Sequence, residues 1–411
     1  MVHFKQLDNG VRLIVKQMSG LMSVSMGIIV GTGACYETAR EDGISHFIEH
    51  MLFKGTKTRT AFQISDRMDA IGAQANAFTG KDITCYYAKS TSTHAAEAFE
   101  VLADLFLNSI FPEDEMKREK GVVVEEINMN EDTPDDLCLD LLAKAFFGEE
   151  NYGRNILGSK QNVKGFSRGD LLGYINERYT ADNVVISMAG NISLELAEEL
   201  ACKYFSSLPK TEADKRTLNV SLQGRNLYKE KDIEQVHIAI AYPSLKRYEP
   251  LCDATQIMNA VLGGSMSSRL FQTVREELGL AYTVYSYVSP YEKSGALTVY
   301  AGVNADNYMQ SVDAVYNCIA DLKKLTLTED EFKRGKEQLL SSLIYAQEST
   351  SSQMLLYGKE LIYSGKIYDF EDRVGKLNAV TLKDVCQAIE YNFDDKYRAT
   401  ALVGKVDRPL K

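Results

Sequence analysis

Residues 112–118, Pro-Glu-Asp-Glu-Met-Lys-Arg, recur as residues 328–334, Thr-Glu-Asp-Glu-Phe-Lys-Arg. Each copy opens a long stretch of helical character, and Pro or Thr followed by acidic residues is typical of a helix start. A second pair of matching segments lies shortly before each copy: Leu102-Ala103-Asp104-Leu105 and Ile319-Ala320-Asp321-Leu322. The alternative is that two helix starts resemble each other by chance.

The match extends further upstream in both halves. A strand-like run, Val24–Val30, precedes a predicted helix from about Gly43, and Val236–Ala241 precedes one from about Pro250. A repeat on this scale indicates duplicated domains. We therefore expect an α+β fold with two homologous domains, each a mostly antiparallel sheet with helices packed on one face. The expected boundaries are residues 1–209 for the first domain, 210–232 for a polar linker and 233–411 for the second domain.

The composition is that of a folded protein with more than one domain. The chain has 411 residues, of which 45% are hydrophobic and 25% charged, too many for one ordinary core. No run approaches the roughly 18 apolar residues of a membrane span. The first residues lead directly into the strand-like Val11–Val15, without a signal peptide or basic leader. We therefore expect a cytoplasmic protein without a membrane partner.

The net charge and the cysteine content bear on nucleic-acid binding and on disulfide formation. The formal net charge of −11 argues against a general nucleic-acid binder, which needs Lys and Arg to neutralise phosphates. It permits an acidic interior that attracts basic ligands but does not prove one. The seven cysteines are scattered and never spaced C-x-x-C, so we expect them to be reduced.

The sharpest local signal is His46-Phe47-Ile48-Glu49-His50. It lies within residues 42–53, which have apolar residues at helical spacing and no proline, so we expect a helix. Two imidazoles four residues apart lie one turn apart on the same face, within reach of one metal ion. Glu49 is close enough to activate a water at that metal. This is the inverted form of the H-E-x-x-H peptidase motif.

Two histidines leave a catalytic zinc site incomplete, because such sites take three protein ligands and keep a fourth position open. The best source of a third ligand is the predicted helix 113–129. Glu119 and Glu126 are seven residues apart and share one face of it, whereas Glu125 points about 100° away from Glu126. Glu119 would then orient an imidazole. The expected metal ligands are His46, His50 and Glu126, a set that favours zinc but could also hold cobalt or manganese.

The second copy of the repeat serves as an internal control. The helix that matches the histidine motif reads Thr255-Gln256-Ile257-Met258-Asn259, and Gly335 and Ser342 stand where the first copy has Glu119 and Glu126. The fold therefore does not require the four chemical residues, which weakens the alternative of a chance match on a charged helix. The remaining histidines, His3, His94 and His237, have no comparable context, and we expect them at the surface or hydrogen-bonded.

At these residues the chain resembles the pitrilysin and mitochondrial-processing-peptidase family of inverted-zincin metallopeptidases. The likeness extends over essentially the whole chain, and Glu126 matches the second glutamate of the family's distal Glu-Glu pair, here Glu125-Glu126. Residues 263–271 and 274–282 look like the family's second-domain signature. The length is similar to that of one processing-peptidase subunit.

The resemblance implies a metalloendopeptidase in which Glu49 is the general base and zinc is the cofactor, one ion per chain. It also implies roles for Arg275 and Tyr282, which match an Arg and a Tyr that hold the substrate and stabilise the developing oxyanion in the family. The residues Asn76, Ala77, Phe78 and Thr79 look like the family's substrate-binding edge strand. A peptide that adds to a sheet edge must be extended, so short or unfolded peptides are the expected substrates.

The resemblance further implies a homodimer, because this chain carries the zinc residues together with Arg275 and Tyr282. We expect Arg275 and Tyr282 of one protomer to complete the site of its partner. Without the resemblance, a surface charge and a packing aromatic are the simpler interpretations of these two residues. Two alternatives to a peptidase remain: a non-catalytic peptide-binding or assembly subunit with a structural metal, and a zinc hydrolase acting on non-peptide amides.

Overall fold

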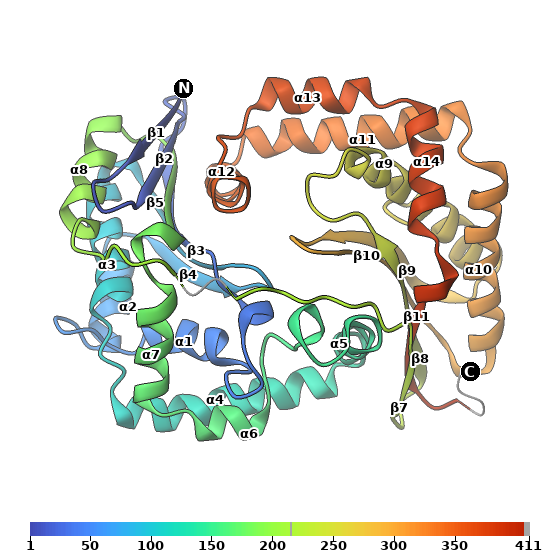
Figure 1. Cartoon of the computed structure of the whole chain (residues 1–411), viewed down its shortest axis with the longest axis horizontal. Helices are drawn as coiled ribbons and strands as arrows, with labels where there is room; N and C mark the ends of the chain where they lie inside the picture. Colours follow the sequence, from blue (N-terminus) through green and yellow to red (C-terminus); the bar gives the residue numbers. More distant parts are fainter. Residues whose placement is uncertain (214–215, 407–411) are drawn as a thin grey trace. The chain divides into compact units, whose positions relative to one another are not determined.

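The computed structural model describes residues 1–213 and 216–406. The chain forms two compact units, and Figure 1 shows the course of the chain with most elements labelled. Unit 1 comprises residues 1–127, 155–217 and 345–368, and unit 2 comprises residues 128–154, 218–344 and 369–411. These units differ from the two continuous domains expected, residues 1–209 and 233–411, because each contains a piece of the other half of the sequence. Among the described residues, no helix has the length and apolar character needed to cross a membrane.

Unit 1 contains a six-stranded sheet in the order β1-β2-β6-β3-β5-β4. Its strands are β1 (Val2–Gln6), β2 (Arg12–Gln17), β3 (Ser23–Val30), β4 (Gln74–Thr79), β5 (Thr84–Thr91) and β6 (Val184–Gly190). Its helices are α1 (Ile44–Leu52), α2 (Ala61–Ala70), α3 (Ala95–Asn108), α4 (Glu113–Asp132), α6 (Lys160–Gly165), α7 (Arg168–Arg178), α8 (Leu194–Phe205) and α12 (Thr350–Ser364). Only β2 and β6 pair in parallel; the other neighbours are antiparallel.

Unit 2 contains a five-stranded sheet in the order β7-β11-β8-β10-β9. Its strands are β7 (Asn226–Glu230), β8 (Gln235–Ser244), β9 (Ala281–Pro290), β10 (Gly295–Asn304) and β11 (Ala399–Gly404). Its helices are α5 (Pro134–Phe147), α9 (Cys252–Leu262), α10 (Tyr308–Leu325), α11 (Glu329–Gln347), α13 (Phe370–Ala379) and α14 (Leu382–Asn392), and a π-helix covers Phe271–Glu277. As in unit 1, one pair of neighbours is parallel, here β7 with β11, and the rest are antiparallel.

The two sheets share one topology. Strands β2, β6, β3, β5 and β4 of unit 1 correspond in order and direction to β7, β11, β8, β10 and β9 of unit 2. The repeated Glu-Asp-Glu segments begin the equivalent helices α4 and α11. The expected fold class, two homologous α+β domains with mostly antiparallel sheets, is therefore confirmed. One detail of the expected linker is wrong: residues 226–230 form β7, because they pair with β11.

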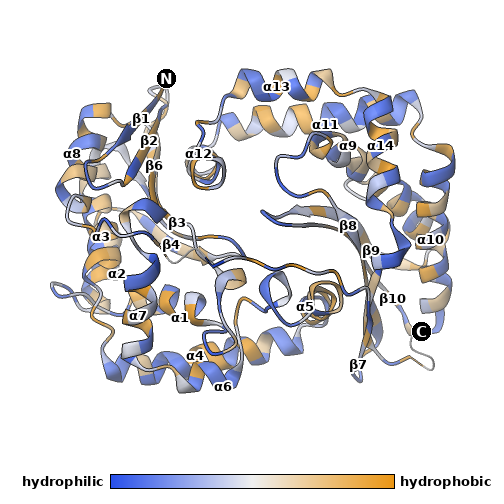
Figure 2. Ribbon diagram, viewed as in Figure 1, coloured by the Kyte–Doolittle hydropathy of each residue, from blue (hydrophilic) through white to orange (hydrophobic). Residues whose placement is uncertain are grey.

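Each sheet is covered on both faces, which differs from the expectation of helices on one face only. Because successive side chains of a strand alternate, Met26 and Ile28 of β3 join the main core with α1 and α3. Ile29 points to the opposite face, where residues of α12 pack on it. The helix α5 packs in the same way on β8 and β11 of unit 2. Figure 2 shows apolar residues concentrated where α1, α2 and α3 lie together.

Helices α5 and α12 are exchanged between the units: α5, from the first half of the sequence, belongs to unit 2, and α12, from the second half, belongs to unit 1. The chain leaves unit 1 within α4, forms α5 in unit 2 and returns; it leaves unit 2 within α11, forms α12 in unit 1 and returns. The periodicity of a helix reports that one face is buried but not which sheet buries it. This is the physical reason why the sequence alone could not place these two helices.

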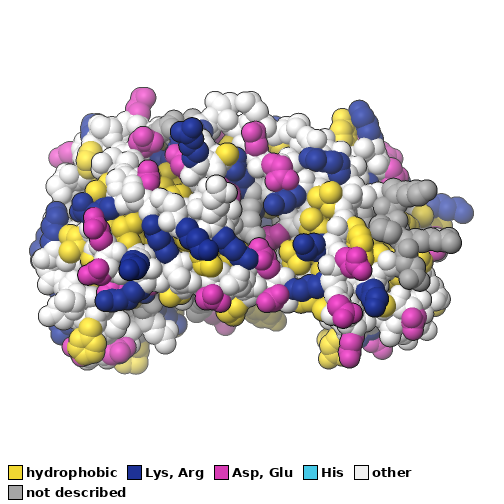
Figure 3. All heavy atoms as spheres, turned by 90° about the horizontal axis from the view of Figure 1, so that it is seen from below, with side chains coloured by type: hydrophobic (Ala, Val, Ile, Leu, Met, Phe, Trp, Pro, Cys, Tyr) yellow, Lys and Arg dark blue, Asp and Glu magenta, His cyan; other side chains and the backbone are white. Residues whose placement is uncertain are grey.

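Figure 3 shows one face of the molecule, on which acidic, basic and apolar side chains are intermingled. The net negative charge therefore does not form a single field on that face. Within the described part of the chain, which includes all seven cysteines, no disulfide is formed.

Candidate metal centre

Helix α1 presents the two histidines of the motif. Five of its residues are buried in the main core and fix its rotation: Ile44, Phe47, Ile48, Met51 and Leu52. His46 and His50 follow each other by one turn, with ring centroids 4.6 Å apart. The local helical structure that the sequence predicts therefore sets both imidazoles on one side of α1.

The start of α1 is held by a residue outside the helix. Gly43, which precedes the helix at φ 91°, has no side chain that could cap it. Instead the buried carboxylate of Glu37 accepts hydrogen bonds from the backbone N–H groups of Gly43 (2.8 Å) and Ser45 (2.9 Å). A Cβ at Gly43 would lie 2.6 Å from the carbonyl oxygen of Leu157, so both the close approach and the backbone conformation require glycine.

Helix α4 supplies the two glutamates. Met116, Glu119, Val123 and Ile127 form its buried face. Glu126 stands beside Ile127, at the border of this face, and its side chain is 43% exposed although its Oε2 atom is buried. Glu125 is exposed, as its rotation around the helix predicts.

The structure brings His46, His50 and Glu126 together. One ligand atom from each lies within 4.8 Å of the others. The Glu126 Oε2 atom is 3.7 Å from His46 Nε2 and 3.4 Å from His50 Nε2. Two atoms that each lie about 2.1 Å from a zinc ion at a tetrahedral angle are roughly 3.4 Å apart. The three donors therefore have the spacing that a zinc ion needs.

The hydrogen bonding of these atoms supports the same conclusion. Glu126 Oε2 is buried and has no hydrogen-bond partner among the described residues. A buried carboxylate oxygen that makes no hydrogen bond is costly unless a nearby cation compensates it. A cation bound between Oε2 and the two imidazoles would remove that cost. Two imidazoles and one carboxylate are also a common donor set of catalytic zinc sites.

Glu119 orients His50. Its carboxylate, on a residue only 4% exposed, lies 2.8 Å through Oε1 from His50 Nδ1. When Glu119 accepts a hydrogen bond from His50 Nδ1–H, the lone pair of His50 lies on Nε2 and points toward Glu126 and His46. The other oxygen, Oε2, accepts from Lys54 Nζ at 2.7 Å.

The two imidazoles have opposite electrostatic surroundings. Burial, together with the neighbouring His50, lowers the pKa of His46 to about 4. Burial also acts to lower the pKa of His50, but its contacts with Glu119 and Glu126 outweigh this and raise the pKa to about 9. His46 is thus ready to ligate as a neutral imidazole, whereas a metal at His50 has to displace a proton.

Glu49 lies beside this group and is tied to the edge strand. Thr79 Oγ1, at the end of β4, donates a hydrogen bond to Glu49 Oε2. Burial raises the pKa of the Glu49 carboxyl, while the hydrogen bond from Thr79 acts in the opposite direction. A carboxylate that is mostly buried and held in one orientation is suited to receive and return a proton.

The residues of the predicted substrate strand lie where a peptide could add. β4 is the edge of its sheet and pairs only with β5. Asn76 is exposed, and its Oδ1 accepts from the backbone N–H of Ala77 at 2.8 Å. Phe78 packs near Tyr87, with ring centroids 6.4 Å apart. The outer edge of β4 therefore carries backbone groups that no other described strand pairs.

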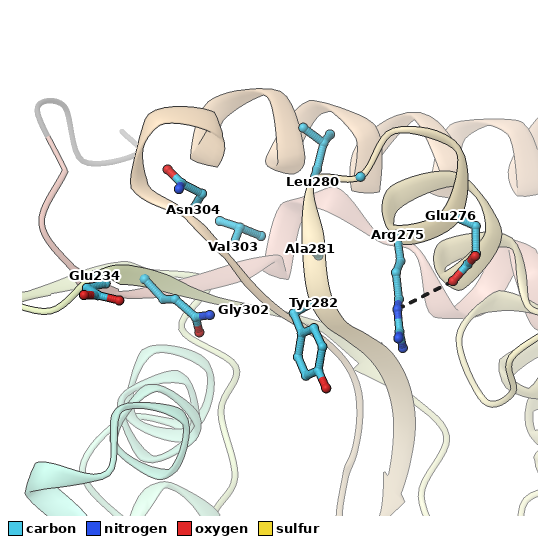
Figure 4. Close-up of a pocket in the computed structure, with 11 residues that line it drawn as sticks. Glu234, Arg275, Glu276, Leu280, Ala281, Tyr282, Gly302, Val303 and Asn304 are labelled. Carbon is cyan, nitrogen blue, oxygen red and sulfur yellow. Dashed lines mark ion pairs between the residues drawn. The ribbon is translucent and has the colours of Figure 1, made fainter.

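Arg275 and Tyr282 form a separate group in unit 2. Arg275 belongs to the π-helix and Tyr282 to the start of β9, and the guanidinium lies 5.3 Å from the centre of the tyrosine ring. Both line a cavity of about 490 Å³ together with Glu234 and Asn304, and Figure 4 shows the side chains of Arg275 and Tyr282 extending in the same direction. Tyr282 is 77% exposed, so it does not serve as a packing aromatic within unit 2.

The corresponding positions of unit 2 serve packing. Thr255 and Asn259 of α9 hydrogen-bond to Asn392 and Ser286. Gly335 of α11 is buried, and a Cβ there would lie 3.1 Å from the carbonyl oxygen of Ile257. Within residues 1–213 and 216–406, His46, His50 and Glu126 are the one set of three side chains arranged to hold a metal.

The other histidines have ordinary environments. His237 is buried, with Nδ1 2.6 Å from the Tyr300 hydroxyl, and His94 pairs with Glu97. Reasoning from sequence did not identify Lys54 or Glu37, which support the centre. Lys54 follows His50 by four residues, which could have suggested a shared partner. Glu37 gave no sequence signal.

Comparison with known proteins identifies the family of the chain. Residues 13–160 match the family described as "Insulinase (Peptidase family M16)", and residues 165–339 match "Peptidase M16 inactive domain". An uncharacterized zinc protease of Bacillus subtilis, YmxG, is 43% identical over 398 residues, covering 97% of each chain. The chain belongs to the insulinase family of peptidases, family M16. All three candidate ligands lie in the segment that matches the first M16 description.

A further relative and two solved structures are similar to this chain over nearly its whole length. An uncharacterized zinc protease of Rickettsia felis is 35% identical over 413 residues and matches 98% of each chain. The crystal structure of a peptidase M16 inactive domain from Pseudomonas fluorescens superimposes with a TM-score of 0.92 at 21% identity over 100% of both chains. A protease from Helicobacter pylori gives a TM-score of 0.92 at 20% identity, covering 98% of this chain and 99% of the other. These two structures share the M16 fold of this chain.

Proposed function

We propose that this chain is a zinc-dependent endopeptidase that hydrolyses short or unfolded peptides. The observation that carries the proposal is the convergence of His46 Nε2, His50 Nε2 and Glu126 Oε2 at the spacing of zinc ligands. Family membership and the names of the zinc-protease relatives support it.

In the proposed hydrolysis, metal binding, proton transfer and the orientation of an imidazole are assigned to different side chains. His46, His50 and Glu126 would hold the zinc ion, which when bound would supply Lewis acidity that makes water more acidic and polarises a carbonyl. Glu49 takes a proton from the attacking water and gives it to the leaving amine, with Thr79 keeping its carboxylate oriented. Glu119 keeps the proton of His50 on Nδ1. Cobalt or manganese are the expected substitutes for zinc.

The substrate binds as an added strand along β4, at residues 76–79. Main-chain hydrogen bonds to a sheet edge recognise an extended backbone with little demand on sequence. A folded protein cannot present such a segment, and this limits the substrates to short or unfolded chains. The edge position of β4, next to the hydrogen bond from Thr79 to Glu49, supports this role.

Arg275 and Tyr282 complete the active site from the second protomer of a homodimer. The exposed Tyr282 and its neighbour Arg275 offer a hydroxyl and a cation to a substrate carbonyl or carboxylate. Mixing Glu49→Gln chains with Arg275→Ala chains should restore about one working site per heterodimer. Absence of rescue, or an active monomer in sedimentation, would refute the exchange of residues between protomers.

The central test is metal content together with cleavage of an unstructured peptide by wild-type and Glu49→Gln protein. The expected result is about one zinc per chain in both proteins and cleavage by the wild type alone. Cleavage that survives Glu49→Gln would refute the assigned base. Unfolding on chelation without any cleavage by the zinc-loaded protein would favour a non-catalytic subunit with a structural metal.

A further inference from the structure

Lys54 is the cation nearest to the carboxylate that orients His50. It lies two residues after the end of α1, and its backbone N–H donates to the carbonyl oxygen of Met51. Its Nζ atom is 2.7 Å from Glu119 Oε2, and its side chain is 29% exposed. The opposite oxygen of the same carboxylate lies 2.8 Å from His50 Nδ1. One buried carboxylate therefore joins a lysine to a candidate metal ligand.

The buried position of Glu119 makes this lysine more than a surface charge. Taking a carboxylate out of water is unfavourable unless a cation or several donors compensate it. His50 gives Glu119 one donor, and as a metal ligand it would be a neutral imidazole. Lys54 is then the group that supplies the compensating positive charge.

The geometry shows what the lysine contributes. The last torsion of a glutamate side chain is broad, so one hydrogen bond leaves the carboxylate plane free to turn. His50 and Lys54 approach the two oxygens from two points at the end of α1, four residues apart. Because Glu119 and Glu126 lie on the same helix, α4, this contact also links the helix of the two histidines to the helix of the third ligand.

We propose that Lys54 is a positioning residue of the metal centre, which acts through Glu119 to fix the orientation of His50 and the approach of α4 to α1. The inference rests on the proposed function, because it concerns the affinity of the site for zinc. Lys54 touches no donor of the metal. Its substitution therefore changes how well the three ligands are arranged and not their number.

The test is zinc affinity, measured on metal-free protein by competition with a chromophoric chelator. Lys54→Met should weaken zinc binding about tenfold, within the range observed when groups that orient metal ligands are lost. Lys54→Arg, which keeps the charge and the donors, should stay within about threefold of wild type. Lys57→Met is the matched control, since Lys57 is exposed in the same loop and its side chain has no ion pair to Glu119; its affinity should equal that of wild type.

A double variant separates positioning from general destabilisation. If Lys54 acts through Glu119, then Lys54→Met should cause no further loss in a Glu119→Gln background. An equal loss in both backgrounds, or a folded Lys54→Met protein with wild-type affinity, overturns the proposal. If circular dichroism shows that Lys54→Met is unfolded, Lys54→Gln takes its place with the same expected weakening. A wild-type chain that binds no zinc overturns the proposed function and this inference together, whereas the variants test only Lys54.

Discussion

The difference between neighbouring side chains on α4 shows how finely the centre is defined. Glu125 and Glu126 are adjacent and chemically identical, yet one is exposed and the other has an oxygen buried against two imidazoles. The rotation of about 100° per residue explains this difference. Only Glu126 shares the face of Glu119.

This contrast gives a prediction at the level of one residue. Glu126→Ala should weaken zinc binding by more than about 100-fold, since loss of a direct ligand exceeds the usual effect of losing an orienting group. Glu125→Ala is the matched control and should bind zinc as the wild type does. Chelator competition measures both. Equal affinities of the two variants would exclude Glu126 as a ligand.

The position of His46 depends on how the N-terminus of α1 is held. Glu37 replaces the missing cap there, and it is buried. Burial raises the pKa of Glu37 from its ordinary 4.5 to about 7, although hydrogen bonds from Ser45 and Gly43 act to lower it. The folded protein therefore holds this proton more tightly than the unfolded chain.

The sign of the pH effect follows from that difference. A raised carboxyl pKa contributes stability that is present below about pH 4.5 and is lost as the pH rises through about 7. Between pH 5.5 and 8 this loss is about 2 kcal/mol. Urea unfolding of wild type and Glu37→Gln at both pH values measures it, because glutamine does not titrate. The wild type should lose about 2 kcal/mol relative to the variant; parallel pH profiles would contradict the shifted carboxyl.

The contact of α12 with its sheet is a second feature at the level of the element. Ser187 Oγ donates to the carbonyl oxygen of Met354. A Cβ at Gly358 would lie 2.2 Å from Ile29 Cδ1 and 2.9 Å from Ser187 Cβ. The helix thus lies directly on the sheet, where an added methyl group has no space.

Gly358→Ala should therefore destabilise the protein by about 1–3 kcal/mol, the usual cost of overpacking a tight contact. Gly375→Ala is the control, because a Cβ at Gly375 of α13 would meet no atom within 4 Å. That variant should be stabilised by about 0.5–1 kcal/mol, since alanine is the better helix former. Urea midpoints of the two variants should move in opposite directions. A neutral Gly358→Ala would show that α12 can shift away from the sheet.

At the scale of the whole molecule, the exchange of α5 and α12 connects the folding of the two units. The face of the unit 1 sheet that carries Ile29 and Cys85 is covered by residues of α12, which come from late in the sequence. In the other direction, α5 covers β8 and β11 with residues from the first half of the sequence. Each sheet is therefore completed by a helix from the other half of the chain.

This arrangement predicts the behaviour of fragments. Residues 1–217 expressed alone should aggregate or unfold without cooperativity, because the face that contains Ile29 is left open to water. Co-expression with residues 218–411 should yield a soluble complex that binds zinc. Gel filtration and urea unfolding of the fragment with and without its complement are the measurements. A monomeric, cooperatively unfolding 1–217 fragment would show that α12 is dispensable.

Much of the metal centre is already determined by the local sequence. Spacings of four residues on α1 and seven on α4 place His46 above His50, and Glu119 in line with Glu126, in any regular helix. The repeated helix starts likewise indicate two copies of one fold, and the second copy shows that this fold does not need the ligands. These properties follow from the period of a helix and from the order of the chain.

Other features exist only because distant elements pack together. The ion pair of Lys54 with Glu119 and the hydrogen bond from Thr79 to Glu49 each join segments whose separation in sequence gives no indication of contact. The same is true of β7, which lies in an expected linker, and of α5 and α12. The cap that Glu37 gives α1 spans only six to eight residues, but no capping pattern in the sequence marks it. A periodic pattern states which face of an element is buried, whereas the tertiary structure decides which partner buries it.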